Sequence, residues 1–500
     1  MLINSHSPQE TEALARVLSL WARPGFVVLL KGDLGSGKST FARAFIHALG
    51  TADQDFDVPS PTFSLVQTYD NTRLPVAHVD LYRLTNAGEA LELGLSDLSA
   101  THIMLIEWPD AYSTMLSENT LTINFAGQDQ TRTIDIHAQN AWKAALARNV
   151  EIETFLQRQS AYSYTRQFLD GDASSRRYEK IITSKKNSIL MDMPQRPDGP
   201  PVKDGKPYSA IAHLAEGLHA VVAINDHLCA MGYSAPQIYD CDLKHGLALI
   251  EDLGTNVYGT MIKAGQYVQE PMRAATLLLA HMGNQTWPTS LKNRDGSIYK
   301  MSHYDETAQL IEVDLLPSWF HTHIHGKQMP AEWQQSFEAE WRKILPLTIQ
   351  TQPQWVLRDF HSPNLIWLAH RKSLKRVGLI DTQDALLGHG AYDLVSFLQD
   401  ARVDISFDLA DALYAEYVLA RKQDGIFDEE AFATAFAILG AQRATKILGI
   451  FARLNKRDGK PHYLKHMPRM SRYLAHNLKH PALSGLKNWF TVHIPEALTQ

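Results

Sequence analysis

Two stretches in opposite halves of this 500-residue chain hold residue types that handle phosphate groups. The run Gly32–Ser39 fits the pattern G-x-x-x-x-G-K-[ST], in which glycines let successive backbone N–H groups turn toward one phosphate. The lysine of this pattern reaches the outer phosphates, and its final hydroxyl is a ligand for Mg²⁺. In the other half, Asp359 and Asn364 have the Asp-x-x-x-x-Asn spacing of a phosphoryl-transfer loop, and Asp381 follows them. Because one nucleotide does not need both sets, the sequence predicts two ATP sites, each with Mg²⁺.

The second set has the functions that phosphoryl transfer needs. A carboxylate must accept the proton of the attacking hydroxyl, and further oxygen ligands must hold Mg²⁺. Asp359 is the predicted catalytic base, and Asn364 and Asp381 are the predicted metal ligands. Asp381 ends the strand-like run 377–380, a position that suits a metal ligand. The alternative is a non-catalytic module that only binds the nucleotide.

The elements around the glycine run have the pattern that a phosphate-binding loop needs. Residues 26–30 form a short apolar run typical of a buried parallel strand, and residues 39–49 predict a helix that ends at Gly50. Apolar residues at helical spacing predict an earlier helix over 11–21. Further strands of this half are predicted at 63–66, 76–80, 103–106, 121–125 and 131–136.

The second half begins with strands and becomes mostly helical. Two predicted strands flank Lys185–Asn187, which reads as a hairpin turn. Residues 194–207, rich in proline, glycine and charge, predict a loop, and residues 208–231 predict a helix. Residues 247–250 predict a strand. Beyond Met261 the pattern is mostly helical to the end, except around the predicted catalytic loop.

Length and composition indicate a soluble globular protein of two to four domains, with 45% apolar and 20% charged residues. The formal net charge of -6 gives no global electrostatic reason to expect strong non-specific binding of nucleic acid. The only two cysteines, Cys229 and Cys241, form no disulfide framework or zinc pattern. No signal peptide and no bilayer-spanning stretch are read, so the prediction is a cytoplasmic protein without a membrane partner.

The change of pattern near residue 140 predicts a domain junction. The predicted division is a P-loop domain over 1–140, a linker over 141–154 and a kinase-like domain over 155–500. The predicted fold class is an α/β P-loop domain followed by a bilobal α+β domain.

Three further motifs follow the glycine loop in a fixed order. They are the runs Ser60–Phe63, His78–Arg83 and Ile106–Pro109. Together with the loop, this set resembles the bacterial TsaE family over about residues 5–137. The resemblance implies an ATPase that works with the proteins of the tRNA threonylcarbamoyltransferase complex, which modify adenosine next to the anticodon. Whether this half touches tRNA directly is left open by the resemblance, and a P-loop kinase of a small metabolite is the alternative.

The TsaE resemblance also implies roles for single residues. Asp80 would orient or deprotonate the attacking water, and Glu107 would hold Mg²⁺ together with Ser39. The alternatives are a hydrogen-bonded loop residue at Asp80 and a packing residue at Trp108. The nucleotide-binding residues that the motif and the resemblance predict are Gly35, Gly37, Lys38, Ser39, Thr40, Thr62 and Trp108.

The second half resembles the aminoglycoside phosphotransferase and choline kinase superfamily. The run Gly171–Arg177 resembles a phosphate-covering turn, and Leu249–Leu253 resembles the hinge that binds adenine. With Leu190–Asp192, Tyr392–Leu394 and Gln442–Gly449, the set resembles the AmgK family over about residues 155–495. These anomeric kinases of cell-wall recycling phosphorylate the C1 hydroxyl of N-acetylmuramate and N-acetylglucosamine. The resemblance implies nucleotide contacts from Ser174, Arg177, Glu251 and Leu253.

Two positions depart from the wider superfamily. Leu357 stands where many members have histidine, and the second strand, 188–193, has no lysine for the α- and β-phosphates. Arg176, Arg177 or Lys180 could supply that charge. The alternatives for this half are a kinase of another small molecule, such as an aminoglycoside or a choline-like alcohol, or a nucleotide-binding regulatory module. An aminoglycoside, being a polycation, would need an acidic pocket.

Overall fold

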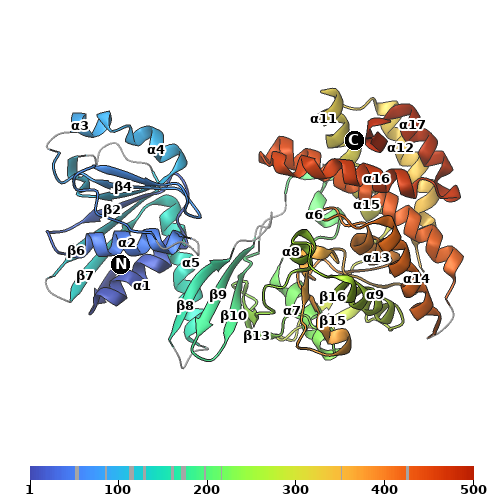
Figure 1. Ribbon diagram of the computed structural model, residues 1–500, viewed down its shortest axis with the longest axis horizontal. Helices are drawn as coiled ribbons and strands as arrows, with labels where there is room; N and C mark the ends of the chain where they lie inside the picture. Colours follow the sequence, from blue (N-terminus) through green and yellow to red (C-terminus); the bar gives the residue numbers. More distant parts are fainter. Residues whose placement is uncertain are drawn as a thin grey trace. The chain divides into compact units, whose positions relative to one another are not determined.

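The computed structural model of the chain describes residues 1–50, 56–84, 87–111, 118–127, 131–158, 163–169, 176–195, 199–215, 217–350, 352–423 and 427–499. The chain divides into two compact units (Figure 1). Unit 1 comprises Met1–Asp170 and Glu179–Lys186, and unit 2 comprises Gly171–Tyr178 and Asn187–Gln500. The predicted linker 141–154 lies inside a helix, α5 (Asn140–Gln157), and the predicted domain limits stay predictions.

Unit 1 is an α/β domain built on a seven-stranded sheet with the order β1-β7-β6-β2-β5-β4-β3. The central strand β2 (Val27–Lys31) is parallel to β5 (Ile103–Glu107) and to β6 (Thr120–Ala126). β4 (Val76–Asp80) is parallel to β5 on its other side. The remaining strands are β1 (Leu2–Ser5), β3 (Val66–Tyr69) and β7 (Arg132–Ala138), and the remaining helices are α1 (Pro8–Ser19), α2 (Lys38–Leu49), α3 (Ala87–Glu92) and α4 (Leu95–Thr101).

Helices cover both faces of this sheet because its central strands are apolar on both sides (Figure 1). Val28 and Leu30 pack in one cluster with α1, α2 and α5, and Val27 and Leu29 pack in another with α3 and α4. Residues 27 to 30 alternate between the two clusters because successive side chains of a strand point to opposite faces of the sheet. The strands predicted at 26–30, 76–80, 103–106, 121–125 and 131–136 are confirmed as β2, β4, β5, β6 and β7, and the helices predicted at 11–21 and 39–49 as α1 and α2, all within a few residues.

One predicted strand of unit 1 is wrong. Residues 63–65 form a turn, and the strand β3 begins at Val66. Leu65 has a left-handed backbone with φ of 63°, which a strand does not accommodate, and the Phe63 side chain is 85% exposed. The apolar run here therefore marks an exposed turn that leads into a short edge strand.

Unit 2 begins with a small lobe of antiparallel strands in the order β13-β14-β10. β14 (Leu247–Glu251) lies between β10 (Asn187–Asp192) and β13 (Ile238–Asp242), and α7 (Leu218–Ala230) packs on these strands through an apolar cluster. β8 (Tyr164–Leu169) belongs to unit 1, and the residues of β9 (Arg177–Thr183) are divided between the units. The predicted strand at 247–250 is confirmed.

The rest of unit 2 is a larger, mainly helical lobe, as predicted. Its longer helices are α9 (Gln269–Gly283), α10 (Glu306–Val313), α12 (Ala331–Ile344), α13 (Ala391–Leu398), α14 (Phe407–Gln423), α15 (Glu429–Asp458), α16 (Met467–Asn477) and α17 (Ser484–His493). Shorter helices are α6 (Tyr208–Ile211), α8 (Tyr258–Lys263), α11 (His321–His325) and α18 (Glu496–Thr499). Four short strands surround the predicted catalytic loop: β17 (Gln354–Val356), β18 (Leu365–Trp367), β19 (Val377–Leu379) and β20 (Leu386–Gly388).

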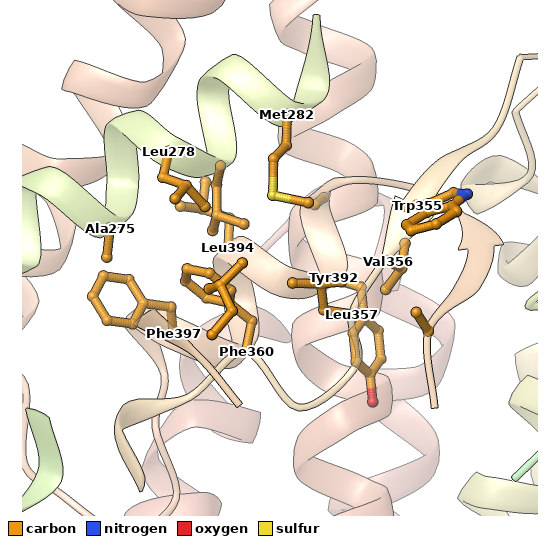
Figure 2. Close-up of a cluster of buried hydrophobic side chains, with 14 of the residues drawn as sticks. Ala275, Leu278, Met282, Trp355, Val356, Leu357, Phe360, Tyr392, Leu394 and Phe397 are labelled. Carbon is orange, nitrogen blue, oxygen red and sulfur yellow. The ribbon is translucent and has the colours of Figure 1, made fainter. Parts of the chain in front are cut away.

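The apolar core of this lobe anchors the predicted catalytic loop. Phe360, the residue after Asp359, is buried and packs beside Phe397 of α13, with ring centroids 5.6 Å apart (Figure 2). Ala275, Leu278 and Met282 on α9 belong to the same core cluster. The chain on either side of Asp359 is thereby held by side chains of the core.

Three predictions for unit 2 differ from the structure. The loop predicted at 194–207 contains a small hairpin of β11 (Pro201–Lys203) and β12 (Lys206–Pro207). The helix predicted at 208–231 is interrupted and forms the two helices α6 and α7. The interruption includes His213, whose φ is 52°, and Gly217, the N-cap residue of α7. The sequence also missed the hairpin of β15 (Ser290–Lys292) and β16 (Ile298–Lys300).

Within the described part of the chain, one helix, α15, is long and apolar enough by composition to cross a membrane. The sequence was expected to contain no bilayer-spanning stretch, and α15 meets that description by length and composition only. However, 83% of its most apolar window is buried in the fold. Leu448 and Phe451 of this helix belong to the second large core cluster. α15 is therefore a core helix of unit 2.

Candidate functional sites

The glycine loop of unit 1 joins β2 to α2, as the motif requires. α2 begins at Lys38, and its N-cap Gly37 has a left-handed φ of 105°. Gly35 and Gly32 also have positive φ, of 76° and 140°. A Cβ at Gly32 would lie 2.3 Å from the backbone oxygen of Phe125, so only glycine fits there. The loop conformation depends on these three glycines.

Lys38 lies against its own loop. Its Nζ donates to the backbone oxygens of Gly32, at 2.7 Å, and Asp33, at 2.9 Å. The same Nζ is 3.9 Å from the ring centroid of Trp108. Burial lowers the pKa of Lys38 below its usual value, against the opposing charges of Glu107 and Asp80. Trp108 thus contacts the lysine that the motif assigns to the phosphates.

The two predicted acids of unit 1 end neighbouring parallel strands. Asp80 at the end of β4 and Glu107 at the end of β5 are partners in the strand register, and both are buried. Ser39 Oγ donates to Glu107 Oε2 at 3.0 Å. Thr62 Oγ1 donates to Asp80 Oδ2 at 3.1 Å, and Thr40 lies half-buried in the first turn of α2. The structure therefore brings the predicted residues of this half together at the glycine loop.

Two residues of this site were not predicted. His78, on β4, is buried, and its Nε2 lies 3.0 Å from Glu107 Oε1. Arg132, on β7, donates through Nε to the backbone oxygen of Ser36 at 2.7 Å and through Nη2 to that of Gly35 at 3.1 Å. His78 orients the acid and Arg132 holds the loop. The sequence signal for His78 is its place at the start of the motif His78–Arg83, whereas Arg132 has no such signal.

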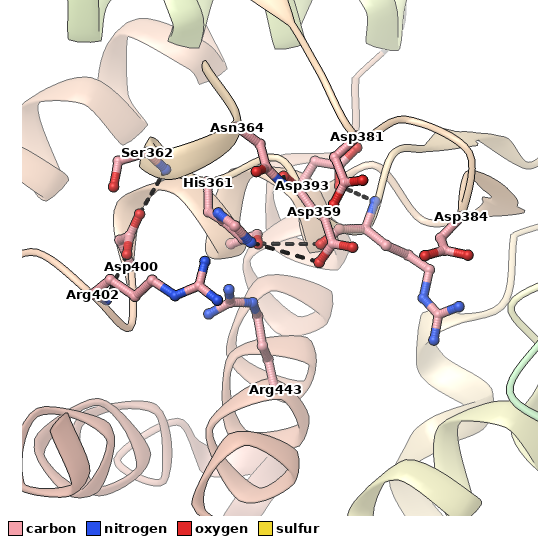
Figure 3. A network of polar contacts seen from close by, with 12 residues as sticks. Asp359, His361, Ser362, Asn364, Asp381, Asp384, Asp393, Asp400, Arg402 and Arg443 are labelled. Carbon is pink, nitrogen blue, oxygen red and sulfur yellow. Dashed lines mark hydrogen bonds and ion pairs between the residues drawn. The ribbon is translucent and has the colours of Figure 1, made fainter. Parts of the chain in front are cut away.

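In unit 2, the three residues of the predicted transfer set converge. Asn364 Nδ2 donates to the backbone oxygen of Asp359 at 3.2 Å, and the backbone N–H of Ile380 donates to the backbone oxygen of Asn364 at 3.0 Å. Asp381 follows with a left-handed φ of 61°. Asp359, Asn364 and Asp381 line one small cavity (Figure 3).

The conformation of the loop is fixed by a carboxylate from α13. Asp393 accepts the backbone N–H of Leu357 at 2.6 Å and that of Arg358 at 2.9 Å. This holds Arg358 in its left-handed conformation, with φ of 64°. The Leu357 side chain is buried in the core. Leucine, where many members of the wider superfamily have histidine, therefore serves in packing. The run Tyr392–Leu394 was noted in the sequence, but this anchoring role was not predicted.

A cluster of buried charged residues contacts the predicted catalytic loop at Arg358. Glu312 of α10 pairs with Arg358 and with Lys446 of α15, whose Nζ lies 2.7 Å from it. Tyr304 donates to the same carboxylate at 2.6 Å. Burial raises the pKa of Glu312, but Lys446 and Arg358 outweigh it and lower the pKa to about 2. The cluster ties α10 and α15 to the residue before Asp359.

Asp359 itself is half-buried and has one basic neighbour close by. His361 Nε2 lies 3.7 Å from Asp359 Oδ1 (Figure 3). Burial raises the pKa of Asp359, but the hydrogen bond and charge of His361 outweigh it and hold the pKa below its usual range. The carboxyl is therefore ionised at neutral pH, as a proton acceptor must be.

The predicted metal ligand Asp381 contacts a basic residue. Its Oδ1 pairs with Arg176 and accepts from Gln383 Nε2 at 3.0 Å. Of the three basic residues suggested to replace the missing lysine, Arg176 is the one with this contact. Arg177 begins β9, and Ser174 lies outside the described residues. A role of Arg177 and Ser174 in nucleotide binding stays a prediction.

The predicted hinge lies at the end of β14. The Glu251 side chain pairs with Arg371, and its backbone N–H donates to Gln237 at 2.9 Å. Leu253 packs with Ile366 and is followed by the positive-φ Gly254. The Glu251 side chain is therefore held in an ion pair, and the Leu253 side chain lies in an apolar environment. Adenine binding here stays a prediction.

A cavity of about 130 Å³ opens beside the predicted base. Five basic side chains and two carboxylates line it, together with an apolar wall from α15. The charged residues of this lining include Asp359, His361, Asp400, Arg402, Arg443 and Lys446. Asp400 accepts the backbone N–H groups of Ser362 and Arg402, each at 2.7 Å (Figure 3). The sequence placed the acceptor site in the helical lobe without naming its residues.

Two protein-family models match the chain, one over the half that contains the first site and one over the half that contains the second. Residues 5–134 match the family model described as threonylcarbamoyl adenosine biosynthesis protein TsaE. Residues 165–433 match the model described as phosphotransferase enzyme family. The first match covers the glycine loop, Asp80 and Glu107, and the second covers Asp359, Asn364 and Asp381.

Curated relatives match each half separately. The N-acetylmuramate/N-acetylglucosamine kinase of Caulobacter vibrioides is 38% identical over 344 residues, which cover 66% of this chain and 92% of that protein. The tRNA threonylcarbamoyladenosine biosynthesis protein TsaE of Rickettsia conorii is 33% identical over 145 residues, 28% of this chain and 82% of that protein. The solved structure of choline kinase LicA from Streptococcus pneumoniae aligns with 69% of this chain and 99% of its own, with 12% identity and a TM-score of 0.38.

Proposed function

The chain belongs to the TsaE family through its first half and to the phosphotransferase enzyme family through its second, and from this premise we propose that it is a bifunctional enzyme. The second half transfers the γ-phosphoryl group of ATP to the anomeric hydroxyl of N-acetylmuramate or N-acetylglucosamine. The first half hydrolyses ATP in support of threonylcarbamoyladenosine formation in tRNA. The proposed domain limits are 1–140 and 155–500, and the proposed location is the cytoplasm.

The convergence of Asp359, Asn364 and Asp381 carries the proposal for the second half. Asp359 accepts the proton of the C1 hydroxyl while the sugar oxygen forms a bond to the γ-phosphorus and the bond to the ADP oxygen breaks. Asn364 and Asp381 are oxygen donors of the kind that bind Mg²⁺ together with substrate phosphates. The metal, when bound, neutralises charge on those phosphates. Leu253 and the Glu251 backbone are the proposed adenine contacts.

The charge of the acceptor cavity separates this proposal from the aminoglycoside alternative. A polycationic acceptor needs a surplus of carboxylates, whereas this cavity has more basic than acidic side chains. An acidic or neutral sugar fits that charge. The decisive measurement is ATP-dependent phosphorylation of the two amino sugars, an aminoglycoside and choline by the full chain, with the phosphorylated position read by NMR. Phosphate on an aminoglycoside alone would overturn the sugar assignment.

For the first half, the arrangement of Lys38, Ser39, Asp80 and Glu107 supports hydrolysis. Lys38 and Ser39 bind the phosphates and Mg²⁺, Glu107 completes the metal site, and Asp80 orients the attacking water. The proposed partners are the proteins of the tRNA threonylcarbamoyltransferase complex. The test is ATP hydrolysis by the full chain, without sugar, in the presence and absence of these proteins. Partner-independent phosphorylation of a small metabolite that requires Lys38 would overturn it.

A further inference from the structure

We propose that a groove at the C-terminal end of α15 extends the acceptor cavity and binds an anionic group of an acceptor larger than a monosaccharide. The acceptor class is an N-acetylmuramate whose lactyl carboxyl group is joined to a short acidic peptide. This inference rests on the proposed kinase function and deepens it by naming a substrate class. The groove has a volume of about 610 Å³, and the lining residues that the argument uses are Ile450, Phe451, Arg453, Arg457, Asp458 and Lys460.

The groove adjoins the acceptor cavity. Ile450 and Phe451 line both spaces, so the two are adjacent. The cavity beside Asp359 has a volume of about 130 Å³, and the groove is several times larger. An acceptor that places its hydroxyl at Asp359 and carries a substituent too large for the cavity therefore has room for that substituent in the groove.

One face of α15 connects the two spaces. Residues at intervals of three and four lie on one face of a helix, and along α15 these are Arg443, Lys446, Ile450, Arg453 and Arg457. The first two line the acceptor cavity, and the last two line the groove. Lys446 and Arg453 are two turns apart, which is about 10 Å along the helix axis. A lactyl group followed by two amino-acid residues, each of which spans at most about 3.5 Å, covers that distance.

The groove has a basic lining. Its described residues include Arg453, Arg457 and Lys460 but only one carboxylate, Asp458. Arg457 donates to both oxygens of Asp458, at 2.7 and 2.9 Å, so this carboxylate already has a partner. Among the residues that the structure describes, neither Arg453 nor Lys460 has a carboxylate within ion-pair distance. The groove therefore favours a ligand that brings its own negative charge.

Arg453 is the cation best placed to bind that charge. Its buried Nε has no hydrogen-bond partner among the described residues, and its guanidinium carbon lies 5.7 Å from the ring centroid of Tyr208. Burial lowers the pKa of Arg453 below its usual value. A partly buried guanidinium without a carboxylate is costly, and a bound carboxylate offsets that cost through charge-assisted hydrogen bonds. The stacked rings of Phe451 and Tyr463, with centroids 5.7 Å apart, give the groove an apolar wall for the aliphatic part of a peptide.

The test uses the full chain and two probes that keep the C1 hydroxyl. N-acetylmuramyl-L-alanyl-D-isoglutamine has one carboxylate, and its C-terminal amide is neutral. Arg453→Gln is expected to lower kcat/KM for the carboxylate probe by about 10- to 100-fold, mainly through KM, because a charge-assisted hydrogen bond is lost. Lys460→Gln should cause a smaller fall. For the amide probe and for N-acetylglucosamine the change should be less than about threefold, since neither brings the anion. Arg273→Gln removes an exposed arginine that pairs with Glu416 and is the matched control.

Each result decides the inference. Equal kcat/KM for the two probes in the wild type would overturn the extended acceptor site, as would a wild type that phosphorylates the monosaccharides but neither probe. An enzyme that phosphorylates no amino sugar would instead overturn the proposed function. Turnover of N-acetylglucosamine shows that a variant is folded, and if Arg453→Gln lacks it, Lys460→Gln carries the test alone. If inorganic phosphate changes the turnover of N-acetylglucosamine and Arg453→Gln or Lys460→Gln abolishes this change, the groove is a site for a free anion and the extension is overturned.

Discussion

The two ATP sites differ in what surrounds the reacting phosphate. In unit 1, the acids Asp80 and Glu107 are buried and already hydrogen-bonded to Thr62 and Ser39. In unit 2, the proposed base Asp359 is half-buried and faces a cavity of about 130 Å³. A small nucleophile such as water needs only positioned groups, whereas a sugar acceptor needs a lined space. The difference indicates two fates of the γ-phosphate on one chain.

The two sites also hold their cations differently. Lys38 lies on the carbonyl oxygens of its own loop, and burial lowers its pKa. In unit 2, Arg358 and Lys446 share one buried carboxylate, Glu312, and are fixed by it. The first cation can exchange carbonyl oxygens for phosphate oxygens without leaving a carboxylate unpaired. The second pair is structural and positions the loop.

The largest expected effect comes from removing the base of unit 2. Asp359→Asn keeps the size of the side chain but does not accept a proton, so kcat for sugar phosphorylation should fall by about 10²–10⁴-fold. ATP hydrolysis without sugar, measured with the partner proteins, should be unchanged. Asp408→Asn, on the exposed start of α14, is the matched control. Equal turnover of sugar in Asp359→Asn and wild type would show that the base is misassigned.

The reciprocal change acts on unit 1. Lys38→Ala removes the cation assigned to the outer phosphates, so partner-dependent ATP hydrolysis should fall by about 10²–10³-fold. Sugar phosphorylation should remain at the wild-type rate, because that reaction uses the other site. Lys31→Ala removes a lysine that pairs with Asp110 before the loop and serves as the control. A fall of both activities in Lys38→Ala would contradict two independent sites.

The structural role of the buried pair in unit 2 can be tested by stability. Glu312→Gln leaves Arg358 and Lys446 without their carboxylate and should lower the free energy of unfolding by about 3–5 kcal/mol. The folded pKa of Glu312, about 2, lies below the ordinary value of 4.5. Its ionised form therefore stabilises the fold above pH 4.5, and this contribution is lost as the pH falls toward 2.

Thermal and chemical unfolding between pH 7 and pH 2.5 measure this effect. The stability difference between wild type and Glu312→Gln should be full at pH 7 and should shrink below pH 4.5. Glu416→Gln, at an exposed ion pair, should change stability by less than about 1 kcal/mol at any pH. A difference that stays constant down to pH 2.5 would contradict the ionised buried carboxylate.

How much the sequence predicted depends on how local each signal is. The strand, glycine loop and helix around Lys38 lie within one short stretch, so residue types and spacing were enough. Asp359 and Asn364 are likewise on one loop. Two of the residues that were missed reach the sites from distant elements, Arg132 from β7 and Glu312 from α10. Spacing along the chain contains no information about such pairings.

The error at residues 63–66 has another cause. An apolar run predicts burial, but Phe63 is 85% exposed and Leu65 has a left-handed backbone. This segment lies next to Thr62, which contacts Asp80. The departure from the local rule therefore occurs beside a proposed site residue, and functional sites are where sequences most often break such rules.

The smallest expected effect concerns His78, the unpredicted neighbour of Glu107. His78→Gln removes the imidazole 3.0 Å from Glu107 Oε1 and leaves the Ser39 contact to Oε2 in place. Because a supporting residue orients the acid without touching the phosphate, ATP hydrolysis should fall by about 10- to 100-fold, and the Mg²⁺ concentration for half-maximal activity should rise. His137→Gln, an exposed change in the same unit, is the control. A fall in rate with no change in the Mg²⁺ requirement would show that His78 does not act through Glu107.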